Sequence, residues 1–475
     1  MKLIENFMNG ANTLLWSYVL IIMLVGLGLY FTFRTKFVQF RMIGEMFRLM
    51  GEGATSGKKG VSSFQAFCIS TASRVGTGNL AGVAIAITTG GPGAVFWMWL
   101  IALIGSASAF VESTLAQIYK VKEGDTFRGG PAYYMEKALK ARWMGVTFAV
   151  LISITFGLAF NSVQANTITS SLNNSFGIDK TIVAVILAVI TAVIIFGGIK
   201  RVAKVSEWMV PIMAGAYVLI ALYIIVTNFT EIPGVIALIF NSAFGFNEVA
   251  GGALGAAMMN GIKRGLFSNE AGMGSAPNAA AAADVSHPVK QGLVQSLSVF
   301  VDTLVICSST AFIILLSGLY TSEEANGIVL TQNALEGSLG SWAGTFLAFI
   351  VFLFAFSSIV GNYYYAESNI EFIKNNKVFL NIFRALVVGM VAFGAIAELS
   401  FVWNLADLFM ALMAIINLIA IALLGKFAYA ALADYKKQKA EGKNPVFYST
   451  NIEGLNNLDA WEDAPKQMDS KRKLG

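Results

Sequence analysis

The chain has 475 residues, of which 56% are hydrophobic and only 13% are charged, and its formal net charge is +5. Soluble domains carry roughly 25% charged residues, so this composition excludes a large soluble protein and indicates a chain that crosses a membrane many times. The positive charge does not indicate nucleic acid binding, because the basic residues gather in alternate loops between apolar segments. Cys68 and Cys307 both fall within apolar segments, which predicts buried free thiols and no disulfide framework.

Apolar segments long enough to cross a bilayer recur along the chain. Eleven spans are expected, near residues 14–33, 63–88, 93–119, 144–171, 180–198, 208–228, 250–283, 291–318, 342–370, 379–397 and 401–425. The first span lacks a basic leading region and a small-residue cleavage site, so we interpret it as a retained span and not as a signal peptide. The sequence therefore predicts an all-α, multi-pass membrane protein.

Charges in the loops predict the orientation of the chain. Lysine and arginine follow the odd-numbered spans: Arg34, Lys36, Arg41, Arg48, Lys58 and Lys59 after the first, Lys120, Lys122, Arg128, Lys137, Lys140 and Arg142 after the third, and Lys200, Arg201 and Lys204 after the fifth. The loops 230–249 and 321–341 hold acidic residues and no lysine or arginine. Because basic loops stay on the cytosolic side, we expect the N-terminus outside and the C-terminus inside the cell.

Two spans contain polar, glycine-rich interruptions. The second carries Ser73-Arg74-Val75-Gly76-Thr77-Gly78-Asn79, and the seventh carries Ser268-Asn269-Glu270-Ala271-Gly272-Met273-Gly274. Unpaired backbone groups are strongly disfavoured in hydrocarbon, so an unwound segment persists only where it faces protein, ions or a wet cavity. Such a segment offers carbonyl oxygens to a cation and a positive half-helix N-terminus to an anion. The two interruptions therefore predict a solute and ion site near the bilayer midplane.

Each interrupted span is followed by four ordinary spans. Two sets of five helices that begin on opposite sides of the membrane form an inverted repeat, here preceded by one extra span. We expect the extra span within residues 1–40, the first repeat at 63–228, the second at 250–425 and a cytosolic tail at 426–475. The tail is polar from Asp434 onward and is expected to be partly disordered.

Other interpretations of these interruptions compete with a binding site. The Gly76-Thr77-Gly78-Asn79 run resembles the start of a dinucleotide fingerprint, but no strand precedes it and no third glycine follows at the needed spacing. Close packing through small residues accounts for Gly82 and Ala86, but it does not account for Arg74 or Asn79. A functional break is therefore the favoured interpretation.

Glu270 is the acid within the second interruption. A carboxylate at membrane depth needs a cation or hydrogen-bond donors, and the expected partners of Glu270 are Na⁺, Lys263, Arg264 or Arg74. A purely structural Glu–Arg pair is an equal alternative. Ser268 beside it offers a hard oxygen ligand.

Further polar side chains at membrane depth occur in other spans. They are Gln164 and Asn166 in the fourth span, Asp302 in the eighth, and Ser357 and Ser358 in the ninth. Asp302 is as readily a satisfied structural acid as a ligand, and serines in membrane helices often bond to a carbonyl of their own helix. These residues therefore strengthen the site only if the fold brings them to the interruptions.

Two other functional classes are disfavoured. An intramembrane enzyme needs an acid/base or metal set, and the single histidine, His287, lies in a predicted loop without one. A channel predicts polar rings that recur in several spans, whereas polar groups concentrate here at two interruptions. No cofactor and no resident metal are expected, and nothing in the sequence indicates a protein partner.

Several long motifs resemble the alanine or glycine:cation symporter family, the sodium–alanine symporters of bacteria and archaea. The resemblance covers about residues 12–430 and rests on the segments 75–84, 90–99, 129–135, 265–277 and 355–358. It implies a leucine-transporter-like fold of eleven spans in a prokaryotic cell membrane. It also implies that Na⁺ drives the import of a small neutral amino acid.

The resemblance also implies which residues form the site. The substrate-binding residues would be Gly76, Thr77, Gly78, Asn79, Gln164, Phe267, Ser268, Asn269, Ser358 and Asn362. The ion-binding residues would be Val75, Asn79, Ser268, Ser357 and Ser358. Na⁺ would be the coupling ion.

Two positions depart from the family pattern. Arg74 lies where a small residue is usual, so its guanidinium is a candidate surrogate for one cation, or an ion-pair partner for Glu270, and H⁺ becomes an alternative to one Na⁺. Asn362 lies where alanine carriers commonly have tryptophan. A polar amide there predicts a wider pocket, which makes glutamine or asparagine an alternative to alanine or glycine as the substrate.

Overall fold

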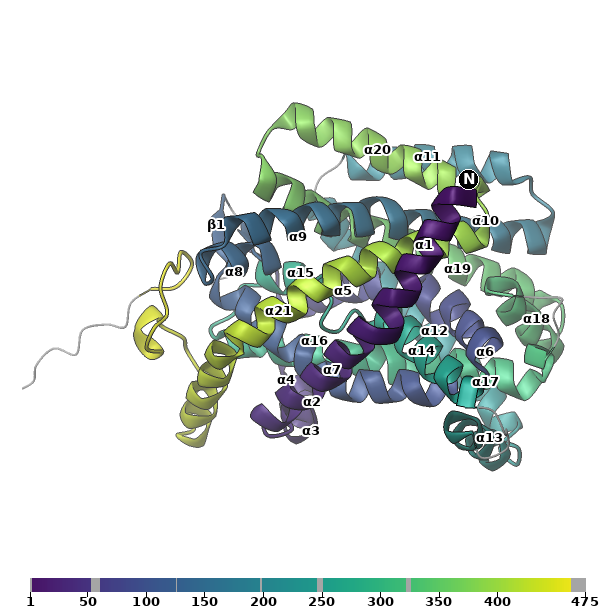
Figure 1. The fold of residues 1–475 in the computed structure, drawn as a ribbon, viewed down its shortest axis with the longest axis horizontal. Coiled ribbons are helices and arrows are strands. Elements are labelled where there is room, and N and C mark those ends of the chain that lie inside the picture. The colour runs from purple at the N-terminus through teal and green to yellow at the C-terminus, as the bar shows by residue number, and fades with distance from the viewer. Residues whose placement is uncertain are drawn as a thin grey trace, which may run out of the picture.

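A computed structural model of the chain describes residues 2–52, 60–124, 126–196, 199–245, 251–321 and 326–462, without the side chains of 2–4, 199–207, 251–253 and 451. Within these residues the protein is a bundle of long helices with one two-stranded hairpin at its side (Figure 1).

The helices occupy nearly all of the described chain. They are α1 (Lys2–Leu14), α2 (Ile21–Arg34), α3 (Val38–Arg41), α4 (Ile43–Met50), α5 (Ser63–Arg74), α6 (Val83–Gly90), α7 (Ala94–Ile118), α8 (Pro131–Lys137), α9 (Arg142–Ile154), α10 (Asn161–Phe176), α11 (Lys180–Ile195), α12 (Ile199–Thr227), α13 (Ile232–Phe244), α14 (Gly251–Asn269), α15 (Ala276–Ala282), α16 (Pro288–Phe300), α17 (Ser308–Ser317), α18 (Ile328–Leu339), α19 (Trp342–Ile373), α20 (Lys377–Ile396) and α21 (Leu399–Ala440). Wider π-helical segments are η1 (Leu15–Leu20), η2 (Gly78–Gly82), η3 (Thr155–Phe160) and η4 (Val301–Cys307), and short 3₁₀ turns are η5 (Leu319–Thr321) and η6 (Ser449–Asn451). The strands β1 (Val121–Glu123) and β2 (Thr126–Arg128) pair antiparallel.

Eight helical stretches in the described chain are long and apolar enough to cross a membrane. They are Glu5–Arg34, Ala94–Ile118, Arg142–Phe176, Trp208–Thr227, Pro288–Ser317, Trp342–Ile373, Lys377–Ile396 and Leu399–Ala440. The other three predicted spans fall on shorter pieces: α5 with η2 and α6, then α11, and then α14 with α15. The prediction of an all-helical, multi-span protein is confirmed, whereas the count of eleven and the inverted repeat stay predictions.

Both predicted acidic loops contain a helix: α18 lies within 321–341, and α13 lies within 230–249. Residues 230–249 include α13, which has a proline in its first turn and ends at Gly245 with φ 68°. Proline at the start and a left-handed glycine at the end are the usual boundary signals of a helix. Residues 246–250 of this loop lie outside the described residues, as do Lys58 and Lys59 of the first basic loop.

The tail is more ordered than expected. Helix α21 runs through Asp434 to its end, and residues 441–462 fold back onto the bundle. The Phe447 N–H donates to the Ser286 carbonyl at 2.8 Å, and the Trp461 indole donates to the Gln117 carbonyl at 3.0 Å. Residues 434–462 of the predicted tail are therefore ordered, because Phe447 and Trp461 attach them to the bundle. Residues 463–475 lie outside the described residues.

The second span is interrupted where expected. Ser62 starts α5 through a capping box with Gln65, and α5 ends at Arg74. Val75 then leaves helical geometry with φ −78° and ψ 88°, and hydrogen bonding of the π-helical type resumes at η2. Residues 75 and 76 are therefore unwound, and Thr77 returns to helical angles with φ −63° and ψ −27°.

The seventh span is interrupted as well. Helix α14 ends at Asn269, and three residues then take left-handed backbone angles: Glu270 with φ 56°, Gly272 with φ 85° and Gly274 with φ 89°. Two glycines accept this conformation readily, and Pro277 restarts the chain as α15. A glutamate with positive φ is uncommon, so contacts around Glu270 must hold it there.

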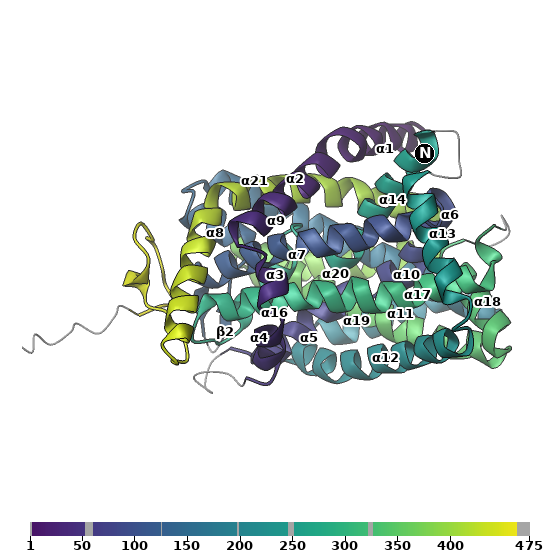
Figure 2. The same ribbon diagram turned by 90° about the horizontal axis from the view of Figure 1, so that it is seen from below.

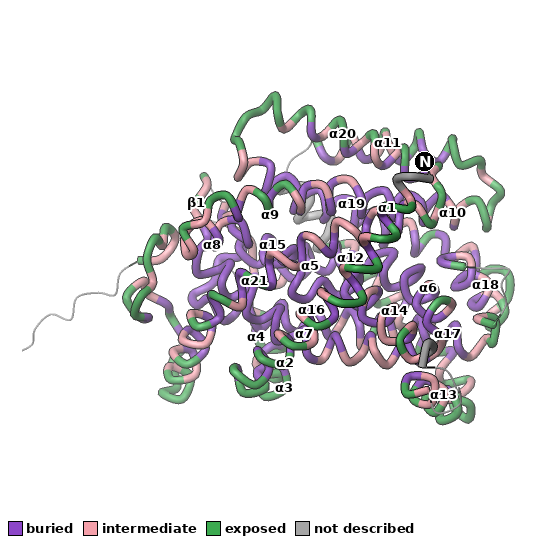
Figure 3. Tube along the Cα trace, viewed as in Figure 1, coloured by how far each residue is buried: buried purple, intermediate pink, exposed green. Residues whose placement is uncertain are grey.

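Both interruptions lie in the buried centre of the bundle (Figure 3). Helix α5 packs against α12, α15, α16 and α19, while α14 packs against α6 and α7. The peripheral helices α11 and α20 lie side by side along one edge (Figure 1), and in the turned view α12 runs along the edge away from α1 and α2 (Figure 2). Protein therefore surrounds both unwound segments, as irregular backbone at membrane depth requires.

Candidate functional site

Five oxygen atoms converge where α5 unwinds beside α19. The Ser358 hydroxyl lies 2.9 Å from the Ala72 carbonyl, 3.0 Å from that of Phe354 and 3.5 Å from that of Val75. The Ser357 hydroxyl lies 2.9 Å from the Phe354 carbonyl and 3.5 Å from that of Ala72. Two hydroxyl hydrogens cannot satisfy every contact among these oxygens. This oxygen cluster, formed by Ala72, Val75, Phe354, Ser357 and Ser358, has the ligand type that hard cations prefer.

Glycine at the first interruption allows neighbouring helices to approach its backbone. A Cβ atom on Gly76 would lie 2.2 Å from the Ser358 hydroxyl oxygen and 2.9 Å from Gln164 Oε1. A Cβ atom on Gly78 would lie 3.0 Å from the Phe267 ring and 3.1 Å from Ser268 Cα. The predicted site residues of four separate helical segments therefore meet at these two glycines.

Neutral amide oxygens accept hydrogen bonds from backbone N–H groups of the first interruption. Gly76 N donates to Asn79 Oδ1 at 3.0 Å, and Thr77 N donates to Gln164 Oε1 at 3.1 Å. The Thr77 hydroxyl is buried and has no hydrogen-bond partner. These groups form a small set of donors that an incoming anionic group can engage.

Asp302 in η4 connects the two interruptions. Its carboxylate accepts from Asn79 Nδ2 at 2.7 Å and from the Ser268 hydroxyl at 2.8 Å. Asp302 is fully buried, and the Cys307 thiol lies beside the same two donors. The sequence left the role of Asp302 open, because it does not reveal which side chains of the eighth span face the interruptions.

Phe267 lies in an aromatic stack. Its ring centroid is 4.4 Å from that of Phe160 and 4.6 Å from that of Trp403. The Arg264 guanidinium lies over the Trp403 ring, 4.4 Å from its centroid. The stack therefore lies beside the interruptions, at the end of α14.

Glu270 is held by hydroxyl groups. Ser73 donates to its Oε1 at 2.9 Å and Ser275 to its Oε2 at 2.5 Å. The Ser73 hydroxyl is also 2.7 Å from Asn362 Oδ1, and Asn362 Nδ2 donates to Asn161 Oδ1 at 3.1 Å. The single hydroxyl hydrogen of Ser73 serves either Glu270 or Asn362 Oδ1, whereas the Asn362 amide nitrogen has a partner of its own in Asn161.

None of the three basic residues expected to pair with Glu270 forms a direct ion pair with it in the described part of the chain. Arg264 Nη2 is 2.6 Å from Asp407 Oδ2, and Lys263 Nζ is 3.4 Å from the same oxygen. Arg74 is buried beside Gln295, with its Nε and Nη2 unpartnered. A direct Glu270–Arg74 pair is not among the ion pairs of the described residues, so the hydroxyls described above are the groups that hold Glu270.

Glu112 in α7 is a site residue that sequence reasoning missed. Its carboxylate accepts from Gly272 N at 3.1 Å, Gly274 N at 3.1 Å and Asn417 Nδ2 at 2.8 Å. It thereby holds two backbone groups of the second interruption. A signal was present, because Glu112 is an acid within an otherwise apolar span.

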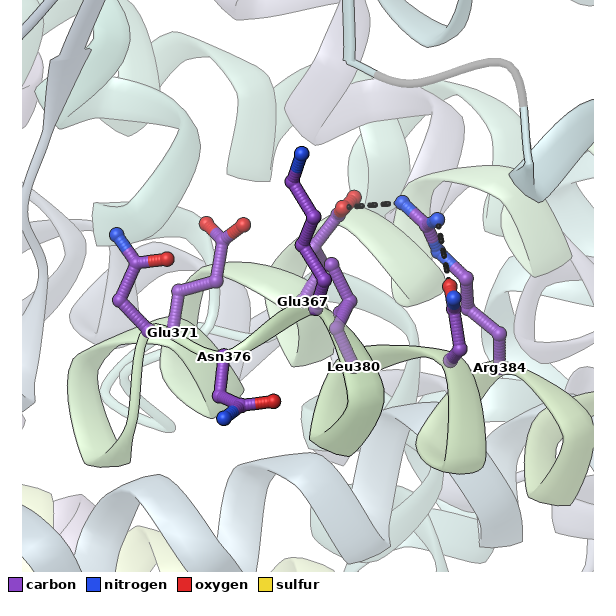
Figure 4. A pocket seen from close by; sticks show the side chains of 8 residues that line it. Glu367, Glu371, Asn376, Leu380 and Arg384 are labelled. Atoms are coloured by element: carbon purple, nitrogen blue, oxygen red, sulfur yellow. Dashed lines mark hydrogen bonds and ion pairs between the residues drawn. The ribbon is translucent and has the colours of Figure 1, made fainter.

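A cavity of about 350 Å³ lies away from the interruptions, where α19 turns into α20 (Figure 4). It is lined by Glu367, Glu371, Asn375, Asn376, Lys377, Leu380, Asn381 and Arg384. Arg384 pairs with Glu367 at 2.9 Å and also donates to the Tyr363 hydroxyl at 2.7 Å. These pairings join the ends of α19 and α20, and no sequence-predicted site residue lines the cavity.

Comparison with known proteins decides the family. Residues 1–449 match the model of the sodium:alanine symporter family. The chain belongs to this family. It is 58% identical to the amino-acid carrier protein AlsT of Bacillus subtilis (strain 168), over 98% of this chain and 99% of that protein.

Two further relatives of the chain carry names that specify a transported solute. It is 55% identical to the probable sodium/glutamine symporter GlnT of Bacillus subtilis (strain 168), over 99% of each chain. It is 38% identical to the sodium/proton-dependent alanine carrier protein of Bacillus sp. (strain PS3), over 90% of this chain and 99% of that protein. The family resemblance inferred from the motifs is confirmed.

A solved structure agrees with the fold. The crystal structure of MhsT in complex with L-phenylalanine matches with a TM-score of 0.55 and 16% identity, over 79% of this chain and 96% of that chain. At this identity the likeness shows the fold alone, which is that of leucine-transporter-like proteins. Members of the sodium:alanine symporter family are transporters, so the chain is a multi-pass protein of the bacterial plasma membrane and not an enzyme.

Proposed function

We propose that the protein is a sodium-coupled symporter that imports a small neutral amino acid of the alanine or glycine class by alternating access. The observation that carries the proposal is the oxygen cluster at the first interruption, where three carbonyls and two hydroxyls meet in a buried place. Family membership supports the same conclusion. Na⁺ is the transported coupling ion, bound through Val75, Ser357 and Ser358 and the carbonyls beside them.

Substrate binds next to the ion in this mechanism. Its carboxylate replaces the neutral amide oxygen of Gln164 at Thr77 N, and a charge-assisted hydrogen bond is roughly twice as strong as a neutral one. The ion and the carboxylate attract one another across Gly76. Each therefore tightens the binding of the other by the same factor.

In the proposed transport cycle, two sets of helices move relative to one another around a fixed site. In the proposed architecture eleven spans form one extra helix and two inverted repeats, with the N-terminus outside and the C-terminus in the cytosol. One set of helices rocks against the other, so the interruptions face first one side of the membrane and then the other.

Uptake into proteoliposomes tests this function. An inward Na⁺ gradient should drive accumulation of labelled alanine, and collapse of the gradient should abolish accumulation. An imposed H⁺ gradient without Na⁺ is the second arm, because H⁺ is the alternative to one Na⁺. Saturable uptake distinguishes a carrier from a channel, and accumulation that ignores both gradients would overturn the proposal.

Ser358→Ala should weaken Na⁺ activation. The variant removes a hydroxyl from the oxygen cluster, and hydrogen bonds to charged groups contribute about 1.5–3 kcal/mol. At about 1.4 kcal/mol per tenfold, the Na⁺ concentration for half-maximal uptake should rise ~10- to 150-fold. Ser309→Ala is the matched control, because the Ser309 hydroxyl donates only to the Val305 carbonyl of its own helix. Equal Na⁺ dependence of the two variants would remove Ser358 from the ion site.

Alanine should compete for uptake at lower concentration than glutamine. Asn362 is fully buried, its Nδ2 donates to Asn161 Oδ1 and its Oδ1 lies 2.7 Å from the Ser73 hydroxyl, so a substrate amide would have to displace protein groups to reach it. Glutamine is the second candidate, because the 55% identical relative is named a sodium/glutamine symporter. Competition of labelled alanine uptake by unlabelled alanine, glycine, glutamine and asparagine separates them. Inhibition by glutamine at or below the alanine concentration would make glutamine the substrate.

A further inference from the structure

Two hydrogen-bond chains start at the Asp302 carboxylate and end in the two interruptions. In the first chain Asn79 Nδ2 donates to Asp302 Oδ1 at 2.7 Å, and Asn79 Oδ1 accepts from Gly76 N at 3.0 Å. Gly76 N can only donate, and an ionised carboxylate can only accept. The orientation of the Asn79 amide is therefore fixed from both ends, and it links Asp302 to the backbone beside the oxygen cluster.

The second chain runs through Thr303. The Thr303 hydroxyl donates to Asp302 Oδ2 at 2.9 Å and accepts from Asn269 Nδ2 at 3.2 Å. Asn269 Oδ1 in turn accepts from Ala271 N at 3.0 Å. Every donor in this chain meets an acceptor, and the chain ends on a backbone N–H of the second interruption.

The two chains share one carboxylate and no other side chain. Each oxygen of Asp302 serves a different interruption, since Oδ2 also accepts from Ser268 in the last turn of α14. All of these side chains are buried, so water does not offer alternative partners at low cost. A shift of either interruption must therefore move or break a bond to Asp302.

We propose that Asp302 is a positioning residue that couples the two interruptions, so that occupation of the oxygen cluster beside Gly76 is transmitted through it to the backbone of the second interruption at Ala271. The inference rests on the proposed function and adds a residue to it. Asp302 acts by setting the backbone of the two unwound segments and does not itself need to contact the ion or the substrate.

The measurable quantity is the coupling factor between ion and substrate. Na⁺ dependence of uptake is measured at low and at saturating alanine, and the ratio of the two half-maximal Na⁺ concentrations gives the factor. Such factors are typically ~5- to 150-fold in coupled sites. Loss of folded protein lowers the maximal rate in both conditions and leaves their ratio unchanged, so the ratio reports coupling and not stability.

Asp302→Asn should lower this ratio toward the part that the direct attraction between the ion and the substrate carboxylate supplies. An amide keeps a single oxygen acceptor, so its NH₂ group must face the donors of one of the two chains. Thr303→Val should lower the ratio by a smaller factor, because it removes the hydroxyl of the second chain and keeps the shape of the side chain, while the Ser268 bond to Asp302 remains. Thr303→Ser retains the hydroxyl and is the matched control, for which the wild-type ratio is expected.

The outcomes separate this inference from the proposed function. Absence of Na⁺-driven uptake in the unmodified protein refutes the function, and with it the coupling. Na⁺-driven uptake with a wild-type ratio in folded Asp302→Asn and in Thr303→Val refutes the role of Asp302 alone. If Asp302→Asn does not fold, as judged by its elution profile and unfolding midpoint, the Thr303 pair still decides the question.

Discussion

Gly76→Ala is expected to weaken the activation of uptake by Na⁺. The added Cβ would lie 2.2 Å from the Ser358 hydroxyl oxygen and 2.9 Å from Gln164 Oε1, so the oxygen cluster and the Thr77 contact must both shift. Overpacking a filled site costs about 1–3 kcal/mol, which corresponds to a ~5- to 150-fold loss of Na⁺ affinity. The half-maximal Na⁺ concentration for alanine uptake in proteoliposomes measures the effect.

A second glycine-to-alanine substitution controls for this variant. Gly389 lies within α20, where a Cβ atom would have no neighbour within 4 Å. Gly389→Ala should therefore leave the Na⁺ dependence unchanged and stabilise the helix slightly, since alanine has the higher helix propensity. If Gly76→Ala behaves like Gly389→Ala, the close approach of α19 to the interruption has no part in ion binding.

The interruptions could be predicted because their signal is local. Glycine and polar residues inside an otherwise apolar span contradict a continuous helix, whatever the rest of the fold does. The structure unwinds residues 75–76 and 270–275, within or next to the stretches that the sequence marks. The left-handed backbone of Glu270 could not be foreseen, because it depends on Ser73 and Ser275 holding the carboxylate.

Contacts between spans are what the sequence could not supply. Glu112 and Asp302 each lie on a span without glycine-rich breaks, and only the packing of α7 and η4 turns them toward the two interruptions. The same limit explains the partner expected for Glu270. Lys263 and Arg264 are close to it along the chain, but the helix carries them to another face, where they meet Asp407 of α21.

The polar composition of the tail also did not predict how much of the tail is ordered. Residues 441–462 have the composition of a solvated extension, yet a few apolar side chains are enough to attach them to the bundle. Phe447 is buried, and its ring packs against His287 and Trp461. Average composition does not detect single anchoring residues of this kind.

Asp407 makes the pairing that joins α14 to α21. Its carboxylate is 1% exposed and lies 2.6 Å from Arg264 Nη2, and Lys263 shares the same oxygen at 3.4 Å. The Arg264 guanidinium also stacks on Trp403, which touches Phe267 of the site. The ion pair therefore supports the aromatic stack beside the first interruption as well as the contact between the two helices.

Asp407→Ala is expected to destabilise the protein by about 3–5 kcal/mol, because removing one partner of a buried ion pair leaves uncompensated charge. Here two cations would lose their carboxylate at once, so the effect should fall at the upper end. The unfolding midpoint of purified protein in detergent measures it.

Glu441→Ala is the matched control, since the exposed Glu441–Lys443 pair is screened by water and its loss should not change the midpoint. Replacing both partners, Arg264→Met with Asp407→Leu, should recover part of the loss, because an apolar pair of similar volume avoids the desolvation of two ions. An Asp407→Ala midpoint equal to that of Glu441→Ala would show that water reaches this pair and that the aromatic stack does not depend on it.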